Sequence, residues 1–511
     1  MDTHTRHEGK GTSPHTLSTV PSPLGLPLVA APLQRAYWTR LQPINRPAAS
    51  DTYKRTMSGS SDLFADNFAI YSLAARRPLF EEGADGRLIM AGLEKILYSM
   101  FMNPVTEEEV DVAEQFFTNK AQVKKFPSKA WQATLDNGGY MPVDVWGVPG
   151  GQTILVKDGK HVPLMSIEGI GALVSHLEPH FEQAYAPIIQ ATKARLFKEA
   201  VGEKFAEFGL RADQTENDHI ALMLAIHVGG GFTYTSDDQA VLLFPDLFKD
   251  IGTVGHEFLM AYQRNGRSLE EAQRIAYETF ICANDRSALL PDIVSTEYSG
   301  LPAIMEQIRR SNGSGKVIMP RFDSGDVGAQ TLLWKRMTID AKLRDSPMVV
   351  EDGMTPEKSR RVKENYAAAG YDPQDIIVGA GGYFQSGCHR DAISLAYKRS
   401  ATEHEGTLEA SLKFSDSPGK ESIPGQIRIY ERGDTLIVAQ ACEGIEGTSL
   451  SRKLVENGHI IYNESIEDQR HRADTTWDKY HHIEYSPATL AIINARTREK
   501  DAELSRIRRE P

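Results

Sequence analysis

The stretch Val317-Ile-Met-Pro-Arg-Phe-Asp-Ser-Gly-Asp326 decides the fold, because an apolar run of strand length ends in a turn rich in charge and glycine. Three further short apolar runs stand nearby, at Asp292–Ser295, Met348–Val350 and Asp375–Val378. Successive runs are separated by segments long enough for a helix. This alternation predicts the βα units of a parallel sheet or barrel.

Polar and glycine-rich turns follow these predicted strands. Arg321–Asp326 ends the second run, Glu351–Gly353 follows the third, and Gly379-Ala-Gly-Gly382 follows the fourth. In α/β barrels, ligands bind at the carboxyl ends of the strands. We therefore expect these turns to share one pocket.

Segments with strand and turn signals flank the βα block on both sides. Short runs separated by glycine turns fill 137–168, and two more lie at 426–430 and 435–439. Because they stand at opposite ends of the chain, we expect one α+β domain assembled from both ends.

The predicted domain plan has four parts. The α+β domain covers 51–170 and 400–495, and the α/β barrel covers 171–399. Residues 1–50 are rich in Pro, Ser and Thr and poor in acid, which indicates a flexible extension. A targeting segment is the alternative, although prolines would break its amphipathic helix. Charges alternate at helical spacing over 496–511, which predicts a solvated C-terminal helix.

Composition limits the class of protein. The chain has 511 residues, of which 41% are apolar and 25% charged, which is typical of a soluble protein with roughly two to four domains. No long uninterrupted apolar run is present, so no membrane partner is expected. A formal charge of -12 disfavours nucleic acid as a partner, since phosphates require a basic face.

The three cysteines, Cys282, Cys388 and Cys442, lie far apart and form no CxxC pair. This argues against a disulfide framework and against a thiolate zinc site, and it favours a reducing, cytoplasmic location. We expect the three thiols to be buried and inert.

Two of the predicted turns could bind phosphate. Arg321 can clamp a phosphate, and the carboxylates of Phe322–Asp326 can bind ribose hydroxyls or hydrated magnesium; an Asx turn that caps a helix is the alternative. Gly379–Gly382, together with the cations Arg390 and Lys398, is moderately specific for a phosphate monoester.

Two further features are ambiguous when taken alone. Phe208-Gly-Leu-Arg211 brings a ring and a guanidinium together, which suits a planar anionic ligand or the packing of a core edge. His256 follows a short predicted strand, and a lone histidine there is more often structural than catalytic.

Taken in order, these segments resemble the type II phosphoribosyltransferases of NAD salvage, the nicotinate and nicotinamide phosphoribosyltransferase family. The resemblance covers most of the chain after residue 50 and rests on the ordered set of motifs. These are Asp51-Thr-Tyr-Lys-Arg-Thr-Met57, Gly139–Val143, Val148–Gly150, Ala191–Lys193, Phe208–Arg211, Gly231–Ser236, His256, Arg321–Asp326, Gly379–Lys398, Ser415–Lys420 and Ile423–Gly425.

The resemblance implies an irregular, incomplete α/β barrel beside the α+β domain, and a homodimer whose active sites borrow residues from the partner. It also implies the reaction, in which nicotinate or nicotinamide attacks the anomeric carbon of phosphoribosyl pyrophosphate and yields a mononucleotide and pyrophosphate. Mg²⁺ is expected with phosphoribosyl pyrophosphate, and ATP as a co-substrate. Such a displacement passes through an oxocarbenium-like state and needs no protein nucleophile.

The resemblance also implies roles for single residues that face the sugar and phosphates. Arg321 and Asp323 would hold the ribose and base region as catalytic residues, with Asp352 on the ribose hydroxyls. The expected phosphate ligands are Gly381, Gly382, Arg390 and Lys398 for the 5'-phosphate, and Arg76 and Lys420 for the pyrophosphate.

Other roles concern the base and ATP. Phe208 and, from the partner subunit, Tyr53 would sandwich the pyridine ring, with Arg211 nearby. His256 corresponds to the histidine that members of the family phosphorylate with ATP, which couples ATP hydrolysis to transfer.

Nicotinate is the expected base. In the family, nicotinamide-type enzymes carry an aspartate directly after the Thr of the Gly-Phe-x-x-Thr segment, and nicotinate-type enzymes carry a serine. Here Thr235 is followed by Ser236 and only then by Asp237. An aspartate at this position would repel the carboxylate of nicotinate, whereas a serine does not. Asp326 and the segment Lys420–Gly425 favour nicotinate as well.

Two segments favour nicotinamide instead. Val350–Gly353 and Gly379–Ser386 are more similar to the nicotinamide branch, and a backbone shift of one residue would bring Asp237 into the pocket. Glu351 stands where the family commonly has a small residue. A non-catalytic homologue that binds phosphoribosyl pyrophosphate, and a barrel enzyme acting on another phosphosugar, also stay open.

Overall fold

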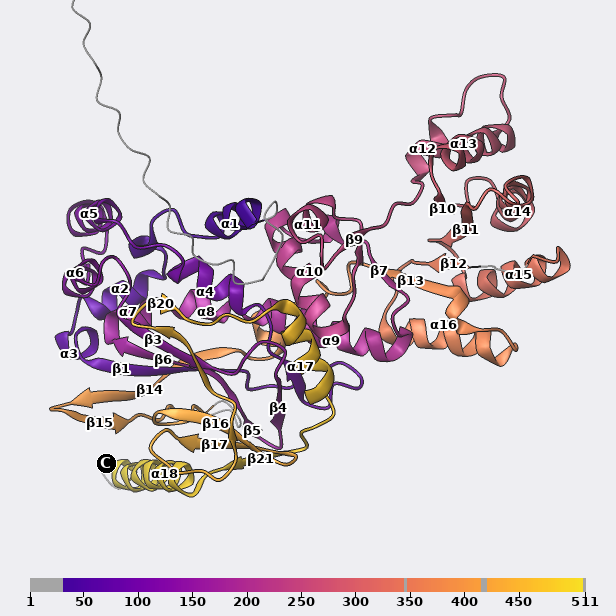
Figure 1. Cartoon of the computed structure of the whole chain (residues 1–511). Helices are drawn as coiled ribbons and strands as arrows, with labels where there is room; N and C mark the ends of the chain where they lie inside the picture. The colour runs from indigo at the N-terminus through magenta and orange to yellow at the C-terminus, as the bar shows by residue number, and fades with distance from the viewer. Residues whose placement is uncertain (1–30, 344–346, 415–420, 509–511) are drawn as a thin grey trace, which may run out of the picture.

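The computed structural model describes residues 31–343, 347–414 and 421–508. It consists of a parallel sheet surrounded by helices and a second part built around antiparallel sheets, which lie side by side in Figure 1. Within the described ranges, no helix combines the length and the apolar character needed to cross a bilayer.

Seven parallel strands form one sheet in the order β10-β11-β12-β13-β7-β8-β9. The sheet stays open between β9 and β10, where the Val254 amide donates to the Ala288 carbonyl at 3.1 Å. This confirms the incomplete barrel. The bounds are β7 Phe205–Glu207, β8 Tyr234–Thr235, β9 Lys249–Asp250, β10 Arg286–Leu289, β11 Val317–Phe322, β12 Met348–Val350 and β13 Ile376–Ala380.

Helices follow the strands in chain order and cover the sheet with apolar side chains. Trp334 of α15 and Tyr366 of α16 are fully buried in the same core as Met348 and Val350 of β12. The helices are α9 Tyr185–Val201, α10 Glu216–Gly230, α11 Asp238–Leu243, α12 His256–Met260, α13 Leu269–Ala283, α14 Leu301–Arg310, α15 Val327–Asp340 and α16 Pro356–Ala368.

The largest antiparallel sheet takes strands from both ends of the chain. Its order is β15-β14-β1-β6-β3-β19-β20, in which β1 pairs with both β6 and β14. This confirms an α+β part built from N-terminal and C-terminal segments. The bounds are β1 Phe68–Ala74, β3 Val143–Gly147, β6 Pro163–Ile170, β14 Ala396–His404, β15 Thr407–Ala410, β19 Arg452–Glu456 and β20 His459–Ile460.

Two smaller sheets and several helices complete this part. The sheets have the orders β18-β16-β17-β21 and β2-β4-β5, with β2 Arg87–Ile89, β4 Thr153–Lys157, β5 Lys160–His161, β16 Ile427–Arg432, β17 Thr435–Gln440, β18 Thr448–Ser449 and β21 His482–Tyr485. The helices are α2 Thr52–Ser58, α3 Asp62–Ala65, α4 Leu93–Phe101, α5 Glu107–Gln115, α6 Ser128–Asp136, α7 Gly171–His176, α8 Glu178–Glu182, α17 Ile466–Thr476 and α18 Pro487–Ile507.

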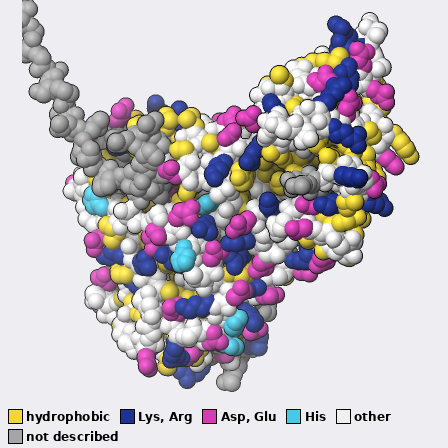
Figure 2. Space-filling view, turned by 45° about the vertical axis from the view of Figure 1, so that its right-hand side comes forward, with side chains coloured by type: hydrophobic (Ala, Val, Ile, Leu, Met, Phe, Trp, Pro, Cys, Tyr) yellow, Lys and Arg dark blue, Asp and Glu magenta, His cyan; other side chains and the backbone are white. Residues whose placement is uncertain are grey.

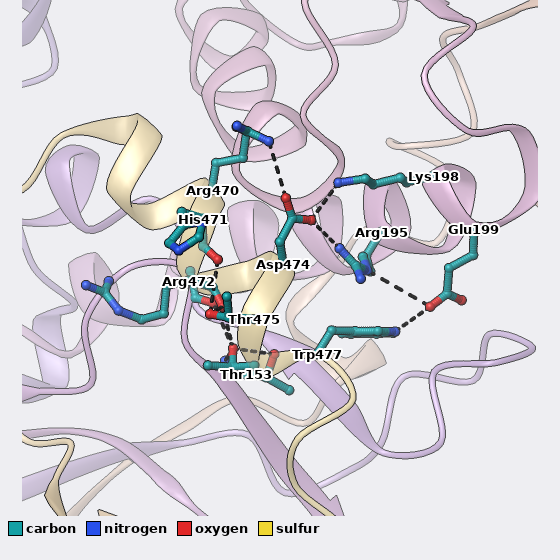
Figure 3. Close-up of polar contacts among 12 residues, drawn as sticks. Thr153, Arg195, Lys198, Glu199, Arg470, His471, Arg472, Asp474, Thr475 and Trp477 are labelled. Atoms are coloured by element: carbon teal, nitrogen blue, oxygen red, sulfur yellow. Dashed lines mark hydrogen bonds and ion pairs between the residues drawn. The ribbon is translucent and has the colours of Figure 1, made fainter.

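Helix α17 ties the C-terminal segment to the barrel helix α9 (Figure 3). Asp474 accepts hydrogen bonds from Arg195 and Lys198, both at 2.5 Å, and the indole of Trp477 donates to Glu199 at 2.5 Å. Trp477 is fully buried. The ion pairs of Asp474 and the buried side chain of Trp477 therefore join the C-terminal segment to the barrel.

The strand predicted at Asp292–Ser295 is wrong, because the strand β10 lies earlier, at Arg286–Leu289. Ala288, Leu289 and Leu290 are buried and precede Pro291, whereas Val294 is 45% exposed. The β-branched pair Ile293-Val294 therefore belongs to the loop at the carboxyl end of β10.

The expectation that 1–50 is a flexible extension is wrong for its second part, and 1–30 lies outside the described residues. Ala31–Arg40 forms helix α1, whose Tyr37 and Trp38 are buried. Trp38 makes edge contacts with Tyr98 and Phe244. Two large aromatic side chains thus anchor this segment to the barrel core.

Two other expectations need correction. Cys282 and Cys442 are exposed and Cys388 is partly buried, so burial of all three thiols is wrong; all three are free. The C-terminal helix begins at Pro487 rather than near 496, because Ser486 caps it by accepting from the Thr489 amide.

Basic and acidic side chains are interspersed over most of the face shown in Figure 2. A phosphate backbone would require a continuous basic surface. This face offers none among its described residues.

Candidate active site

A cavity of about 990 Å³ lies at the carboxyl ends of the parallel strands. Loops after β7, β9, β11, β12 and β13 contribute to its wall, as the βα pattern predicts. The predicted site residues that line it are Phe208, Arg211, Ser236, Arg321, Asp323, Asp352, Gly381 and Gly382.

The loops after β7 and β13 approach each other closely. The Phe208 amide donates to the Ala380 carbonyl at 3.0 Å, and a Cβ on Gly381 would overlap the backbone of Gly209. A side chain at either glycine would separate the two loops. These glycines therefore hold Phe208 beside the Gly381–Gly382 turn.

Arg321 is held by protein groups on several sides. Its Nε and Nη2 donate to the Glu351 carboxylate at 3.0 and 2.8 Å, in a bidentate pair. Its Nη1 donates to Thr253 Oγ1 at 3.1 Å and to the Val254 carbonyl at 3.2 Å. Arg321 therefore links the ends of β11 and β12 to the segment after β9, beside the opening of the barrel.

His256 lies next to two carboxylates, one of which sequence reasoning missed. His256 Nε2 is 2.9 Å from Asp292 Oδ1, and its Nδ1 is 3.9 Å from Asp323 Oδ2. The sequence pattern places Asp292 at the start of a strand and does not mark it as a site residue. One ligand atom from each of the three residues lies within 4.8 Å of the others, which suits a metal ion.

The two carboxyls of this group have opposite pKa shifts. Partial burial opposes ionisation of Asp292, but hydrogen bonds from Ser324 (2.8 Å) and His256 outweigh it and lower the Asp292 pKa. Burial raises the pKa of Asp323, and repulsion by Asp292 adds to it against the attraction of Arg321. Such divergent pairs are common in active sites.

Asp326 and Asp352 differ in their surroundings. Asp326 accepts from the Ala329 amide at 2.9 Å and caps α15, as the Asx-turn alternative predicted. Asp352 lines the cavity with φ of 75°, a left-handed conformation that is strained for a residue with a side chain.

Ser236 lines the cavity, whereas Asp237 points elsewhere. Asp237 is 1% exposed and accepts from the Gln239 and Ala240 amides at 2.9 and 3.2 Å, which caps α11.

A buried network under the cavity wall was also missed by sequence reasoning. His219 Nδ1 is 2.6 Å from Asp213, and its Nε2 is 3.2 Å from Glu207. Glu207 accepts from the Gly209 amide and from Thr235 Oγ1 (3.2 Å), the residue before Ser236. Burial alone would lower the pKa of His219, but the two carboxylates outweigh it and raise the pKa to about 10.

The remaining predicted residues form a second group on the α+β part. Lys398 Nζ lies 3.2 Å from Glu178, and Arg390 lies 3.4 Å from Glu182. Tyr53 donates to Glu178 at 3.0 Å. None of these residues lines the cavity.

This second group, which we call the cation cluster, comprises Lys54, Arg76, Arg390 and Lys398. Lys54 pairs with Glu178 and is a member that sequence reasoning missed. Burial lowers the pKa of Arg76 and of Lys398, and repulsion among these cations lowers both further. Burial, with repulsion by Lys398, lowers the pKa of Lys54 to about 8. Lys420 lies outside the described residues.

Known proteins with similar sequences are pyridine phosphoribosyltransferases. The chain is 25% identical over 432 residues to a nicotinamide phosphoribosyltransferase of Xanthomonas campestris, covering 75% of this chain and 89% of the relative. It is 24% identical over 281 residues to a nicotinate phosphoribosyltransferase of Bacillus subtilis, covering 55% of this chain and about half (51%) of that relative. No family model matches the chain.

Solved structures share the fold. The human nicotinic acid phosphoribosyltransferase superposes with a TM-score of 0.66 at 17% identity, over 88% of this chain and 99% of that one. A nicotinate-nucleotide pyrophosphorylase from Pyrococcus furiosus superposes with a TM-score of 0.59 at 15% identity, over 84% and 95%.

The incomplete barrel, the flanking antiparallel sheets and these similarities define the class of protein, a type II phosphoribosyltransferase. Within that class, the sequence is similar to those of nicotinate and nicotinamide phosphoribosyltransferases.

Proposed function

We propose that this protein transfers the phosphoribosyl group of phosphoribosyl pyrophosphate to a pyridine base, with nicotinate preferred. The observation that carries the proposal is the cavity, where Phe208, Asp323, Asp352 and the Gly381–Gly382 turn meet at the carboxyl ends of the strands. This combination offers a stacking surface, acceptors for ribose hydroxyls and backbone donors for phosphate.

The chemistry requires positioning rather than a nucleophile. As the bond to pyrophosphate breaks, positive charge develops on the ribose, and nearby carboxylates such as Asp323 and Asp352 stabilise that charge. Phe208 stacks on the pyridine ring and aims its nitrogen at the anomeric carbon. The backbone amides of Gly381 and Gly382 bind the 5'-phosphate.

Asp292 and Asp323 fit the Mg²⁺ that this reaction implies. Both offer carboxylate oxygens within the same small group, and Mg²⁺ prefers oxygen ligands. Bound there, Mg²⁺ would neutralise charge on the leaving pyrophosphate.

A homodimer would complete the active site. The cation cluster and Tyr53 lie outside the cavity of their own chain, although their residue types suit phosphates and a stacked ring. We propose that the partner subunit supplies these residues to the cavity. The expected roles of Arg390, Lys398 and Arg76 on phosphates then apply across the interface.

ATP is proposed as a co-substrate through His256. Its imidazole is 45% exposed, and Asp292 at 2.9 Å orients the ring by binding Nε2. With Nε2 bound in this way, Nδ1 is the nitrogen available as a nucleophile toward a phosphate.

The preference for nicotinate rests on Ser236 and Arg211. Ser236 faces the cavity while Asp237 is occupied as a helix cap. Arg211 lines the cavity and makes no hydrogen bond or ion pair with any other described residue. Its guanidinium is therefore available to the carboxylate of nicotinate.

Nicotinamide is the second candidate base, and one observation favours it. The acidic residues that line the cavity outnumber its two arginines, Arg211 and Arg321. The acids are Asp238, Asp250, Glu257, Asp323, Glu351 and Asp352. A neutral base meets less repulsion in such surroundings.

Purified protein supplied with phosphoribosyl pyrophosphate, Mg²⁺ and a competing mixture of labelled nicotinate and nicotinamide tests the proposal. We expect nicotinate mononucleotide to dominate. In the matched variant Asp323→Asn, kcat/KM should fall by roughly a hundredfold or more while the Tm stays unchanged, because a carboxylate beside the developing charge is lost. Binding of phosphoribosyl pyrophosphate without any product would indicate the non-catalytic homologue instead.

A further inference from the structure

Glu351 accepts half of the hydrogen bonds that the Arg321 guanidinium donates. Two of the four hydrogen bonds donated by the guanidinium go to this carboxylate, and the other two go to Thr253 and Val254. A guanidinium has five N–H donors. Arg321 therefore keeps one donor for any ligand in the cavity.

The Glu351 side chain is built into the cavity wall. Glu351 is 8% exposed. A Cβ on Gly379 would lie 2.5 Å from Glu351 Cγ, so the glycine leaves the space that the side chain fills. Because the carboxylate is buried against Arg321, the pair presents a nearly neutral surface to the cavity.

The pair also lies beside the expected position of the base. Arg321 Cζ is 5.9 Å from the centre of the Phe208 ring, and both residues line the cavity. A substituent on a ring stacked against Phe208 would therefore lie within electrostatic range of Arg321. The negative charge of Glu351 therefore reduces the attraction that Arg321 exerts on an anionic substituent of the base.

We propose that Glu351 sets how strongly the site discriminates between an anionic and a neutral pyridine base. By neutralising Arg321, Glu351 leaves recognition of the nicotinate carboxylate to Arg211 and Ser236 and allows nicotinamide as a competing substrate. Glu351 acts through Arg321 and is a specificity-determining residue that need not touch the substrate. The inference rests on the proposed function.

The test compares kcat/KM for nicotinate and nicotinamide in the wild type and in Glu351→Gln, without ATP. Glutamine keeps an oxygen that can accept from Arg321 but removes the negative charge. We expect the nicotinate-to-nicotinamide ratio of kcat/KM to rise by roughly tenfold, as expected for one unpaired charge near the substrate. Glu351→Asp keeps the charge and should stay within about threefold of the wild-type ratio.

Asp250→Asn is the matched control. Asp250 lines the same cavity and is exposed, and no hydrogen bond or ion pair joins it to another described side chain. It should shift the ratio much less than Glu351→Gln does, because Asp250 does not pair with Arg321. A shift as large as that of Glu351→Gln would show that the total charge of the cavity, and not the pair with Arg321, sets the preference.

Two results would overturn the inference without touching the proposed function. The first is a Glu351→Gln variant that keeps its activity and has the same nicotinate-to-nicotinamide ratio as the wild type. The second is a variant that loses activity equally toward both bases, which would assign Glu351 a structural role alone. Failure of the proposed function is a distinct outcome, in which the wild type forms no mononucleotide from either base.

Discussion

At the scale of single residues, the group formed by His256, Asp292 and Asp323 combines the proposed nucleophile with two carboxyls of different acidity. Asp292, with its lowered pKa, stays ionised and orients the imidazole. Asp323, with its raised pKa, lies 3.8 Å from Arg321 and faces the cavity. One small group thus connects the proposed phosphorylation site to the substrate cavity.

His256→Ala should separate ATP coupling from transfer. We expect transfer without ATP to stay within about threefold of the wild type, and stimulation by ATP to vanish, since the imidazole is the proposed phosphate acceptor. Mononucleotide formation with and without ATP measures both. Glu257→Gln, which alters the next residue of α12, is the matched control and should keep the stimulation. Stimulation that persists in His256→Ala would assign this histidine a structural role.

The residues of the cavity differ in how well the sequence predicts them. The turn Gly379–Gly382, Asp323 of the DSGD turn, and the pair Phe208 and Arg211 carry local patterns, and all of them line one cavity. Asp292 carries no pattern, because its role depends on where β10 ends. The pairing of Arg321 with Glu351 depends on the register of β11 against β12, which no local pattern reveals.

At the scale of elements, the buried His219 network connects loops that line the cavity. His219 on α10 contacts Glu207 of β7 and Asp213 of the following loop. Asp213 also accepts from Gln385 at 2.9 Å, beyond the Gly381–Gly382 turn. One imidazole therefore fixes the loops after β7 and β13 relative to α10.

The raised pKa of His219 predicts a pH dependence of stability. Folded His219 keeps its proton up to about pH 10, whereas the unfolded chain loses it near 6.5. The stabilisation is therefore full below pH 6.5 and is lost as pH rises to 10, at up to about 1.4 kcal/mol per pH unit.

Thermal unfolding of the wild type and of His219→Gln from pH 6.5 to 10 checks this prediction. The wild type should have a higher Tm than His219→Gln at pH 6.5, and this difference should disappear as the pH rises to 10. His482→Gln, at an exposed position, is the control and should follow the wild type. Parallel curves for wild type and His219→Gln would contradict a protonated His219.

Elements were predicted best where apolar residues and turn residues agree. The runs at β11, β12 and β13 satisfy both signals and form strands. At β10, the β-branched residues lie in the loop, and the strand uses Ser287-Ala288, whose burial comes from tertiary packing. Helix α1 was not predicted, because the many prolines around it indicated a flexible segment although Tyr37 and Trp38 are residues typical of a core.

At the scale of the whole molecule, the predicted site residues fall into two groups. One lines the barrel cavity, and the other, the cation cluster with Tyr53, lies on the α+β part. The ordered motifs of the sequence indicate both groups but not their separation, because that separation follows from the packing of β14 against β1. A site completed across a dimer accounts for both groups.

The most direct test of this account is complementation between Asp323→Asn, which impairs the cavity, and Lys398→Ala, which impairs the cation cluster. Each variant alone should be nearly inactive. Co-expressed chains should recover roughly a quarter of wild-type transfer, because random pairing makes half of the dimers mixed and each mixed dimer has one intact site of two. The rate of mononucleotide formation measures the recovery. If the co-expressed chains are no more active than the two separate variants added together, the site is not shared between subunits.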